Sequence, residues 1–220
     1  MANFKINGVT FASETGGVIS LSNANVFPPG MIIGSAVTFF NEITSYTMAA
    51  GTSVGDYGLN TGIDIEDLTV TYTPANPANK LFVSGVVNFS TSGHSTGKTY
   101  AAVRVKRQLN GAGYSMLESA MQSDTAAMAG SSSQKGIAGY STNYGNDHSG
   151  HPSFNLHFGF IDSSHVTTTG HAVNYKLNHT LKGNDANDKT LYLNRSFYQN
   201  NDYGSHTSVS YIRVEEIQNG

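Results

Sequence analysis

The sequence predicts an all-β protein, an antiparallel sandwich of jelly-roll-like type. Apolar and polar residues alternate along many short segments, which places the apolar side chains on one face of a strand. Residues typical of turns, including many of the 24 glycines, separate these segments at fairly even intervals. No internal repeat is visible, so a sandwich is favoured over a solenoid.

The first 30 residues differ from the rest and are expected to form a short N-terminal segment. Two short strands are expected over 3–12 and 17–21, around a turn at Gly16 and Gly17. The following Pro28-Pro29-Gly30 unit continues neither a strand nor a helix, because proline lacks a backbone N–H. We place the boundary here, with 1–30 as an attachment segment and 31–220 as the sandwich domain.

Eight strands are expected in the main domain. The segment 31–40 (MIIGSAVTFF) is almost continuously apolar, which is typical of a central strand buried on both faces. The other seven segments alternate. The expected strands are 31–40, 68–73, 80–90, 99–107, 153–161, 171–181, 189–195 and 207–217.

The segments between these strands are predicted to be loops. A Gly-rich loop is expected over 49–63, a turn over 74–79 and a hairpin tip over 184–188. One short helix is predicted within 116–129, where Ser and Asp weaken the helical pattern. The stretch 130–152 is rich in Ser, Gly, Asn and Tyr and is expected to be an exposed loop.

Composition narrows the classes of partner. Charged residues make up 12% of the chain, with 12 Lys and Arg against 15 Asp and Glu. Proteins that bind nucleic acid need clustered basic residues, so no nucleic-acid partner is expected. Arg104 and Lys106 share one face of their strand and are interpreted as a solvated face.

The absence of cysteine and of targeting patterns limits which chemical sites the protein can have and where it is expected to be made. The chain has no cysteine, which excludes disulfides, thiolate zinc sites and cysteine nucleophiles. No apolar run approaches the roughly 18 residues of a membrane span, and the first residues lack the pattern of a secretory signal. We therefore expect no membrane insertion, synthesis in a cytoplasm, and release by lysis or within a larger particle.

Several histidines are weighed as possible ligands. His148 and His151 lie three residues apart in a Gly-flanked segment, but a loop pair without a third ligand is weak metal geometry. His157 alternates with apolar neighbours and is assigned to the outer face of its strand. His179 is expected to be a hydrogen-bonded core or interface residue. No metal or cofactor is predicted.

Enzymatic chemistry is not indicated by any motif. The run 162–165 (DSSH) contains the residue types of a nucleophilic triad, but a triad is built in space, and a turn is the favoured interpretation. Glu215 and Glu216 point to opposite faces of a terminal strand, so they form no glycosidase pair. Asp185, Asn187 and Asp188 are assigned to turn chemistry instead of calcium binding. We predict that the chain is not an enzyme.

A recognition surface is predicted near 130–152. Tyr together with Ser, Gly and Asn is the composition of adaptable binding surfaces, and tyrosine rings stack on sugars. The alternative is that these tyrosines pack at strand ends. The candidate receptor-binding residues are Tyr140, Tyr144, Asn146, His148 and His151.

Three blocks of the sequence resemble short virion proteins of marine tailed phages, notably phages of cyanobacteria. They are the opening 1–33, the block 68–90 (LTVTYTPANPANKLFVSGVVNFS) and the block 189–217 (KTLYLNRSFYQNNDYGSHTSVSYIRVEEI). The resemblance implies a tail-fibre or related appendage, a homotrimer, and binding to a glycan or protein of the host cell surface. It implies no catalytic residues. The candidate virion-attachment residues are Phe4, Ile6, Val9, Phe11, Pro28 and Pro29.

Three functions stay open at this point. The favoured one is a tail-fibre or receptor-binding protein located in the virion and contacting other virion proteins. A capsid decoration protein has the same composition and differs in location. A virion-associated polysaccharide depolymerase is third. A trimer is also expected because a cysteine-free chain outside the cell needs another source of stability, such as apolar faces buried between subunits.

Overall fold

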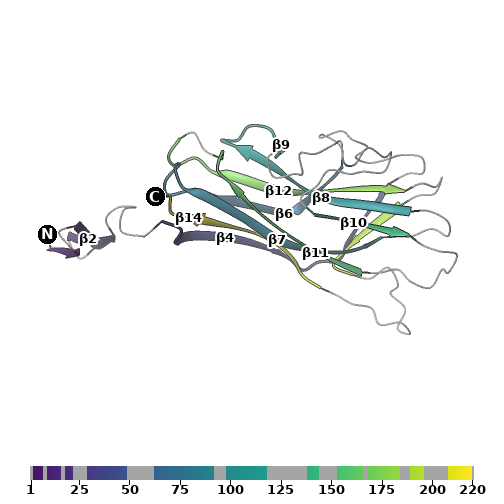
Figure 1. The fold of residues 1–220 in the computed structure, drawn as a ribbon, viewed down its shortest axis with the longest axis horizontal. Coiled ribbons are helices and arrows are strands. Elements are labelled where there is room, and N and C mark those ends of the chain that lie inside the picture. The colour runs from purple at the N-terminus through teal and green to yellow at the C-terminus, as the bar shows by residue number, and fades with distance from the viewer. Residues whose placement is uncertain are drawn as a thin grey trace.

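The structure is a computed structural model, and it contains two separate groups of strands (Figure 1). A small sheet near the N-terminus uses residues before 22, and a much larger assembly of strands begins at residue 32. The described residues are 2–6, 9–15, 18–21, 29–48, 62–91, 98–117, 138–143, 153–165, 168–183, 189–195 and 208–219.

The N-terminal sheet has three antiparallel strands, β1 (Ala2–Ile6), β2 (Val9–Thr15) and β3 (Val18–Leu21). The expected single strand over 3–12 is wrong, because Ile6 pairs with Val9 and the chain reverses between them. The expected strand over 17–21 corresponds to β3. All the pairings of these three strands lie within the small sheet.

The larger part consists of two antiparallel sheets, which we call the β7 sheet and the β12 sheet. The β7 sheet has the order β4-β14-β7-β13-β5. β14 and β13 pair with successive parts of β7 along one of its edges, and β11 pairs with the other edge. Its strands are β4 (Ile32–Phe40), β14 (Ser210–Ile217), β7 (Lys80–Thr91), β13 (Lys189–Leu193), β5 (Thr44–Met48) and β11 (Ser153–Asp162).

The β12 sheet has the order β10-β8-β12-β6, and a short strand β9 also pairs with β8. Its strands are β10 (Ala138–Asn143), β8 (Lys98–Leu109), β12 (Val173–Gly183), β6 (Ile63–Tyr72) and β9 (Ser115–Met116). The chain passes repeatedly from one sheet to the other. The predicted all-β antiparallel sandwich is therefore confirmed.

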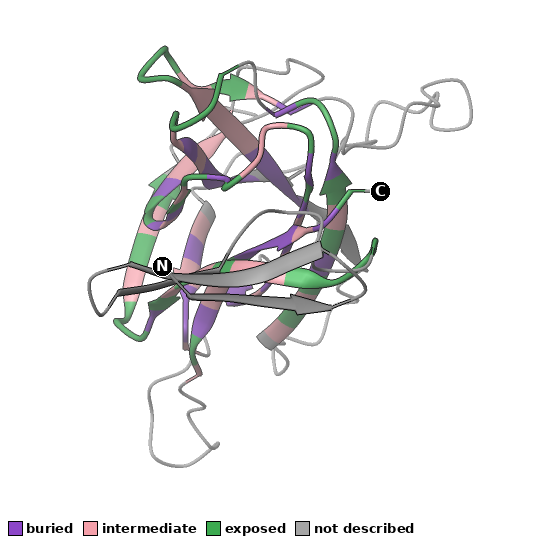
Figure 2. Ribbon diagram, turned by 90° about the vertical axis from the view of Figure 1, so that its left-hand side faces the viewer, coloured by how far each residue is buried: buried purple, intermediate pink, exposed green. Residues whose placement is uncertain are grey.

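The core lies between the two sheets, where the buried residues in Figure 2 face one another. Alternate residues point inward, as the period of two predicts. Each fully buried aliphatic or aromatic side chain contributes about 1.5 to 3 kcal/mol of transfer free energy. The inward set includes Leu81, Val83, Val87 and Phe89 of β7, Ile212 and Val214 of β14, Ile65, Leu68 and Val70 of β6, and Val173, Tyr175 and Leu177 of β12.

Several expected elements are wrong in position or partner. Residues 44–48 and 138–143 form β5 and β10, the first missed and the second assigned to a loop. Met116 belongs to β9 and Leu117 follows it outside any helix, whereas 118–129 of the segment expected to hold a helix lie outside the described residues. The segment 184–188 is not a hairpin tip, because the strands on either side of it belong to different sheets.

The segment 31–40 also differs from expectation. It forms β4, which among the described strands pairs with β14 alone and is an edge strand instead of a central one. Its inner face is partly covered, and the Thr38 hydroxyl donates to the backbone oxygen of Thr69 across the sandwich. On its outer face Val37 and Phe39 are 45% and 65% exposed.

The sandwich has two distinct ends. We call one the base, where Ile32 and Lys80 both pair with Ile217. The N-terminal sheet lies beyond the base in Figure 1. We call the other the far end, where Thr91, Lys98, Ser153 and Gly183 mark strand ends.

Within the described residues, no helix is long and apolar enough to cross a membrane.

Candidate functional site

Of the candidate recognition residues, the structure describes Tyr140, whose strand β10 ends at Asn143 at the far end. Tyr140 lies on β10 opposite Ala101, so it belongs to a strand instead of the predicted loop. Tyr144, Asn146, His148 and His151 lie outside the described residues. The segment 144–152 that contains these four connects Asn143 and Ser153, and both of these residues are strand ends at the far end.

The candidate attachment residues belong to the opposite part of the molecule. Phe4 and Ile6 lie on β1, and Val9 and Phe11 lie on β2. Pro28 is outside the described residues.

Pro29 is exposed in a turn at the base. The next residue, Gly30, has a φ of 89° and donates its N–H to the Gln218 carbonyl at 2.9 Å. Gln218 returns a hydrogen bond from its own N–H to the Met31 carbonyl at 2.8 Å. The segment that enters the sandwich, Gly30 and Met31, is thus hydrogen-bonded to Gln218, which follows the last strand.

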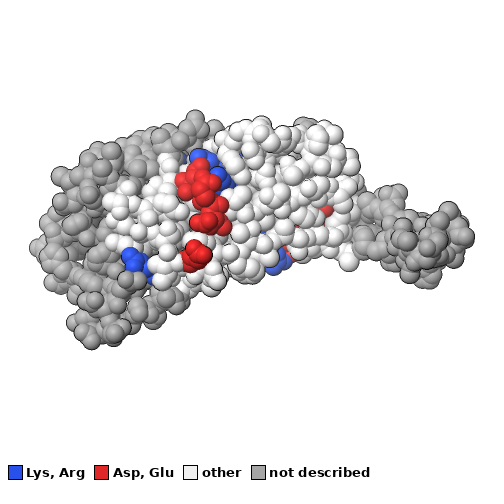
Figure 3. Space-filling view, turned by 180° about the vertical axis from the view of Figure 1, so that it is seen from behind, with Lys and Arg blue, Asp and Glu red and all other residues white. Residues whose placement is uncertain are grey.

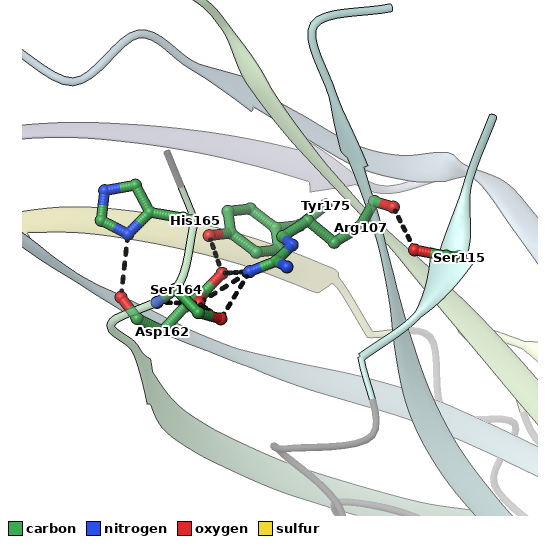
Figure 4. A network of polar contacts seen from close by, with 6 residues as sticks. All are labelled: Arg107, Ser115, Asp162, Ser164, His165 and Tyr175. Atoms are coloured by element: carbon green, nitrogen blue, oxygen red, sulfur yellow. Dashed lines mark hydrogen bonds and ion pairs between the residues drawn. The ribbon is translucent and has the colours of Figure 1, made fainter. Parts of the chain in front are cut away.

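A buried polar cluster centred on Asp162 joins the two sheets near the base (Figure 4). Asp162 ends β11, whereas Arg107 and Tyr175 come from β8 and β12 of the opposite sheet. Arg107 Nη1 donates to both carboxylate oxygens at 2.8 and 2.7 Å, and the Tyr175 hydroxyl donates to Oδ2 at 2.7 Å. The Ser164 N–H and hydroxyl donate to Oδ1 at 3.0 and 3.1 Å. The carboxylate is therefore desolvated but fully hydrogen-bonded.

The surroundings shift the pKa values of this cluster. Burial alone would raise the pKa of Asp162, but hydrogen bonds from Arg107, Tyr175 and the Ser164 N–H outweigh it, and the pKa is lowered. Burial, with the nearby Asp162 charge, raises the pKa of Tyr175. Burial lowers the pKa of His165 despite its contact with Asp162. The network thus favours an ionised Asp162 and a neutral His165.

The DSSH run does not form a nucleophilic triad. The Ser164 hydroxyl donates to Asp162, and His165 Nδ1 lies 3.0 Å from the Asp162 carbonyl oxygen instead of contacting Ser164. A base must accept the proton of the nucleophile, and His165 does not. The run forms a turn in which Ser164 donates hydrogen bonds to the Asp162 carboxylate, and a turn was the interpretation that the sequence favoured.

A second buried carboxylate, Glu216 on β14, fixes the turn between β6 and β7. It accepts hydrogen bonds from the Tyr72 hydroxyl at 2.8 Å and from the N–H groups of Ala75 and Asn76 at 2.9 and 3.1 Å. The Asn79 amide donates at 2.6 Å, and its oxygen accepts the Asn219 N–H at 3.0 Å. Burial and the hydrogen bond to Glu216 raise the pKa of Tyr72. The turn 74–79 is therefore held by the last strand of the chain.

Gly34 leaves room for the Tyr72 hydroxyl, and this gives a test of the Glu216 cluster. A Cβ at position 34 would lie 2.1 Å from that oxygen. We expect Gly34→Ala to lower the free energy of unfolding by about 1 to 3 kcal/mol through overpacking. In a Tyr72→Phe background the same substitution should cost less, because the clashing oxygen is gone. Urea unfolding of the four proteins of this cycle measures the difference, and additive effects would contradict the contact.

The outer face of the β12 sheet is polar and connected. Asn178 and Lys106 both contact Asp64 at 2.6 Å, and Lys176 pairs with Glu66 at 2.5 Å. The predicted solvated face of β8 is corrected here. Arg104 is 1% exposed, and burial lowers its pKa.

The edge strand β6 of this sheet is acidic and irregular. Acidic side chains gather in one band on the side of the molecule shown in Figure 3. Glu66 and Asp67 are exposed on β6, where the pairing with β12 shifts register between Lys176 and Leu177. Charges and a bulge on an edge strand oppose pairing with another sheet, so this edge is protected.

The remaining histidines follow the sequence analysis in position. His157 is exposed on the outer face of β11, and His179 is buried in the core with its ring edge against Phe89 at 4.9 Å. Among the described residues, no group of three His, Asp or Glu side chains is arranged to bind a metal ion. The segment 184–188 lies outside the described residues.

Sequence reasoning missed the buried ionic residues. From the sequence, Asp162 is assigned to a turn and Arg104 to a solvated face, and Glu216 has no role beyond its place on a terminal strand, since charged side chains are usually exposed. The PANPAN turn was one available signal, since its free backbone N–H groups need an acceptor. The partner, Glu216, is 140 residues from Asn76 in sequence and could not be found from spacing.

The comparisons with known proteins give only distant structural likenesses. No protein-family model and no curated protein matches the sequence. A structure of the Gx strain of infectious bursal disease virus aligns over 94% of this chain and 41% of its own, with 8% identity and a TM-score of 0.33. The VP2 subviral particle of that virus aligns over 94% and 42%, with 11% identity and a TM-score of 0.33. The chain thus spans less than half the length of these proteins, and scores of this size say nothing about its function.

Proposed function

We propose that this chain is a structural protein of a tailed-phage virion, and that it acts as a tail-fibre or receptor-binding protein. The observation that carries the proposal is the separation of its two candidate binding parts. The N-terminal sheet holds four of the candidate attachment residues and lies beyond the base. The segment 144–152 departs from the far end. A protein that links a virion to a cell needs this polarity.

The sandwich supplies a stiff body between these parts. Its base is fastened by the buried carboxylates Asp162 and Glu216, which connect β6, β8, β11, β12, β14 and the β6–β7 turn. The partners in this proposal are neighbouring virion proteins, further copies of the chain as a homotrimer, and a host surface glycan or protein. The resemblance to marine phage virion proteins supports the same setting. We propose no catalytic step.

Labelling of purified virions tests this function. Gold-conjugated antibody raised to the chain should label tail-associated fibres in electron micrographs, and purified protein should reduce adsorption of the phage to host cells. Label spread over the head would instead support the capsid decoration protein. Absence of label from intact and disrupted virions would contradict both roles. Release of reducing sugar from host capsule by the purified chain would support the depolymerase.

A further inference from the structure

The two outer faces of the sandwich differ in chemistry. The outer face of the β12 sheet is polar, with Lys106, Lys176 and Asn178 in ion pairs or hydrogen bonds. The outer face of the β7 sheet instead carries Phe39 at 65% and Ile161 at 56% exposure. An exposed apolar surface rimmed by polar residues is typical of a protein interface.

Strand register shows how these apolar residues are arranged. Three rows cross the outer face along β4, β14, β7 and β11. They are Phe39–Tyr211–Val86–His157, Val37–Arg213–Ser84–Gly159 and Ser35–Glu215–Phe82–Ile161. The rings of Phe39 and Tyr211 lie 5.9 Å apart, and the Phe82 ring packs over Gly159. We call these three rows the assembly face.

The assembly face has little charge to desolvate. Arg213 and Glu215 are the cation and anion in these rows, and they form an ion pair with each other. A surface whose charges are already paired costs less to bury than one with isolated charges. The same face of a second copy carries the same internal ion pair and no net charge from it, so the two faces do not repel each other.

The sequence of β4 supports burial on both sides. The run MIIGSAVTFF has the pattern of a strand covered on both faces, yet the single chain covers only the inner one. A second chain that covers the outer face would account for this pattern.

The size of the face is sufficient for a stable contact. The assembly face is the middle of the outer surface of its four strands. These strands are 9, 8, 12 and 10 residues long, so at about 3.3 Å per residue and about 4.8 Å between strands their outer surface spans roughly 600 Å². Two such faces together bury roughly 1,200 Å², above the approximately 1,000 Å² expected of a biological interface. A homotrimer can bury the same face of every copy when the three faces surround the threefold axis, so that each face contacts both neighbouring copies.

We propose that the assembly face is where copies of this chain contact one another. The inference deepens the proposed function, on which it rests for a protein present in several copies on one virion. The occupant is a second copy of the chain, and Phe39, Val37 and Ile161 are the apolar side chains that lose most exposure on contact.

Mass measurement of the full chain and one variant tests the proposal. The wild type should be oligomeric at about 10 µM in light scattering. Phe39→Ser should raise the dissociation constant about 30-fold, as for a hot spot of about 2 kcal/mol. Ile43→Ser removes an apolar side chain that is 47% exposed but lies outside the rows, and should leave the mass unchanged. Circular dichroism should show that both variants fold. A wild-type mass of one chain at that concentration, or equal dissociation constants of the wild type and Phe39→Ser in a dilution series, would overturn the proposal.

Thiol labelling gives a second measurement, which does not depend on a variant that separates the copies. Because the chain has no cysteine, a single introduced thiol reports on its own site. Val37 and Ile43 are 45% and 47% exposed in the single chain, so they form a matched pair. Val37→Cys should react with a maleimide at least about tenfold more slowly than Ile43→Cys, because a buried thiol reacts only while the copies are apart. Equal rates in an oligomer would overturn the proposed face, whereas virion labelling tests the proposed function separately.

Discussion

Replacing Asp162 with alanine is expected to lower the free energy of unfolding by about 3 to 5 kcal/mol. The substitution leaves the Arg107 guanidinium without its anion, although the Arg107 side chain is only 15% exposed. It also removes the acceptor of the Tyr175 hydroxyl, which is buried in the core. An uncompensated buried charge is the main cost, because the apolar surroundings cannot replace the lost carboxylate.

The matched control is Asp67→Ala on the edge strand β6. It removes the same kind of side chain from an exposed position, so the free energy of unfolding should change by less than about 0.5 kcal/mol. Urea unfolding of the three proteins at neutral pH measures both effects. A loss below about 1 kcal/mol for Asp162→Ala would show that the cluster does not hold the two sheets together.

Acid should weaken the protein through the same carboxyl group. The pKa of Asp162 is lowered from 3.8, so the folded protein binds fewer protons there than the unfolded chain does. The resulting stabilisation is complete above the unfolded pKa and is lost as the pH falls through the folded pKa. The difference in unfolding free energy between the wild type and Asp162→Asn should therefore shrink below about pH 4. A constant difference from pH 6 to pH 2 would contradict the lowered pKa.

Replacing Glu216 with alanine is expected to cost a similar amount, about 3 to 5 kcal/mol, for a different reason. Four donors lose their acceptor together, and they are the Tyr72 hydroxyl, the N–H groups of Ala75 and Asn76, and the Asn79 amide. Each donor that stays buried without a partner costs about 1 to 3 kcal/mol, and entry of water reduces the sum.

Hydrogen exchange gives a local reading of the same substitution. The amides of Ala75 and Asn76 should exchange faster in Glu216→Ala than global unfolding alone explains, because their acceptor is gone. Asp67→Ala again serves as the control, because Asp67 is exposed on β6, the strand that also carries Tyr72. Unchanged protection of both amides would contradict the role of Glu216 in holding the turn.

Alternation in the sequence located most strands because it reports directly on which face is buried. The segments 80–90 and 153–161 correspond closely to β7 and β11. It failed for β5 and β10, whose sequences TSYTM and AGYSTN are short and polar, so no apolar face marks them. Both strands depend on pairing with β13 and β8. Pairing of this kind is set by the tertiary fold.

Which strands pair with each other, and whether a charged side chain is buried, also depend on the tertiary fold. A polar segment between two strands predicted a hairpin at 184–188, but nothing local distinguishes a hairpin from a crossing between sheets. Arg104 and Glu216 are both buried although residue type alone favours the surface, and Glu216 is held by a turn about 140 residues away in sequence. The apolar run of β4 predicted a central, well-buried strand, but it forms an edge strand whose outer face the single chain leaves open.

The proposed function depends most on polarity, with the N-terminal sheet toward the virion and the far end toward the host. Two tagged phages test it directly, one with an epitope at the N-terminus and one with the same epitope within 144–152, each labelled with gold on intact virions. The account predicts that the 144–152 label lies farther from the virion body than the N-terminal label. Equal distances, or an N-terminal label that lies outermost, would contradict it.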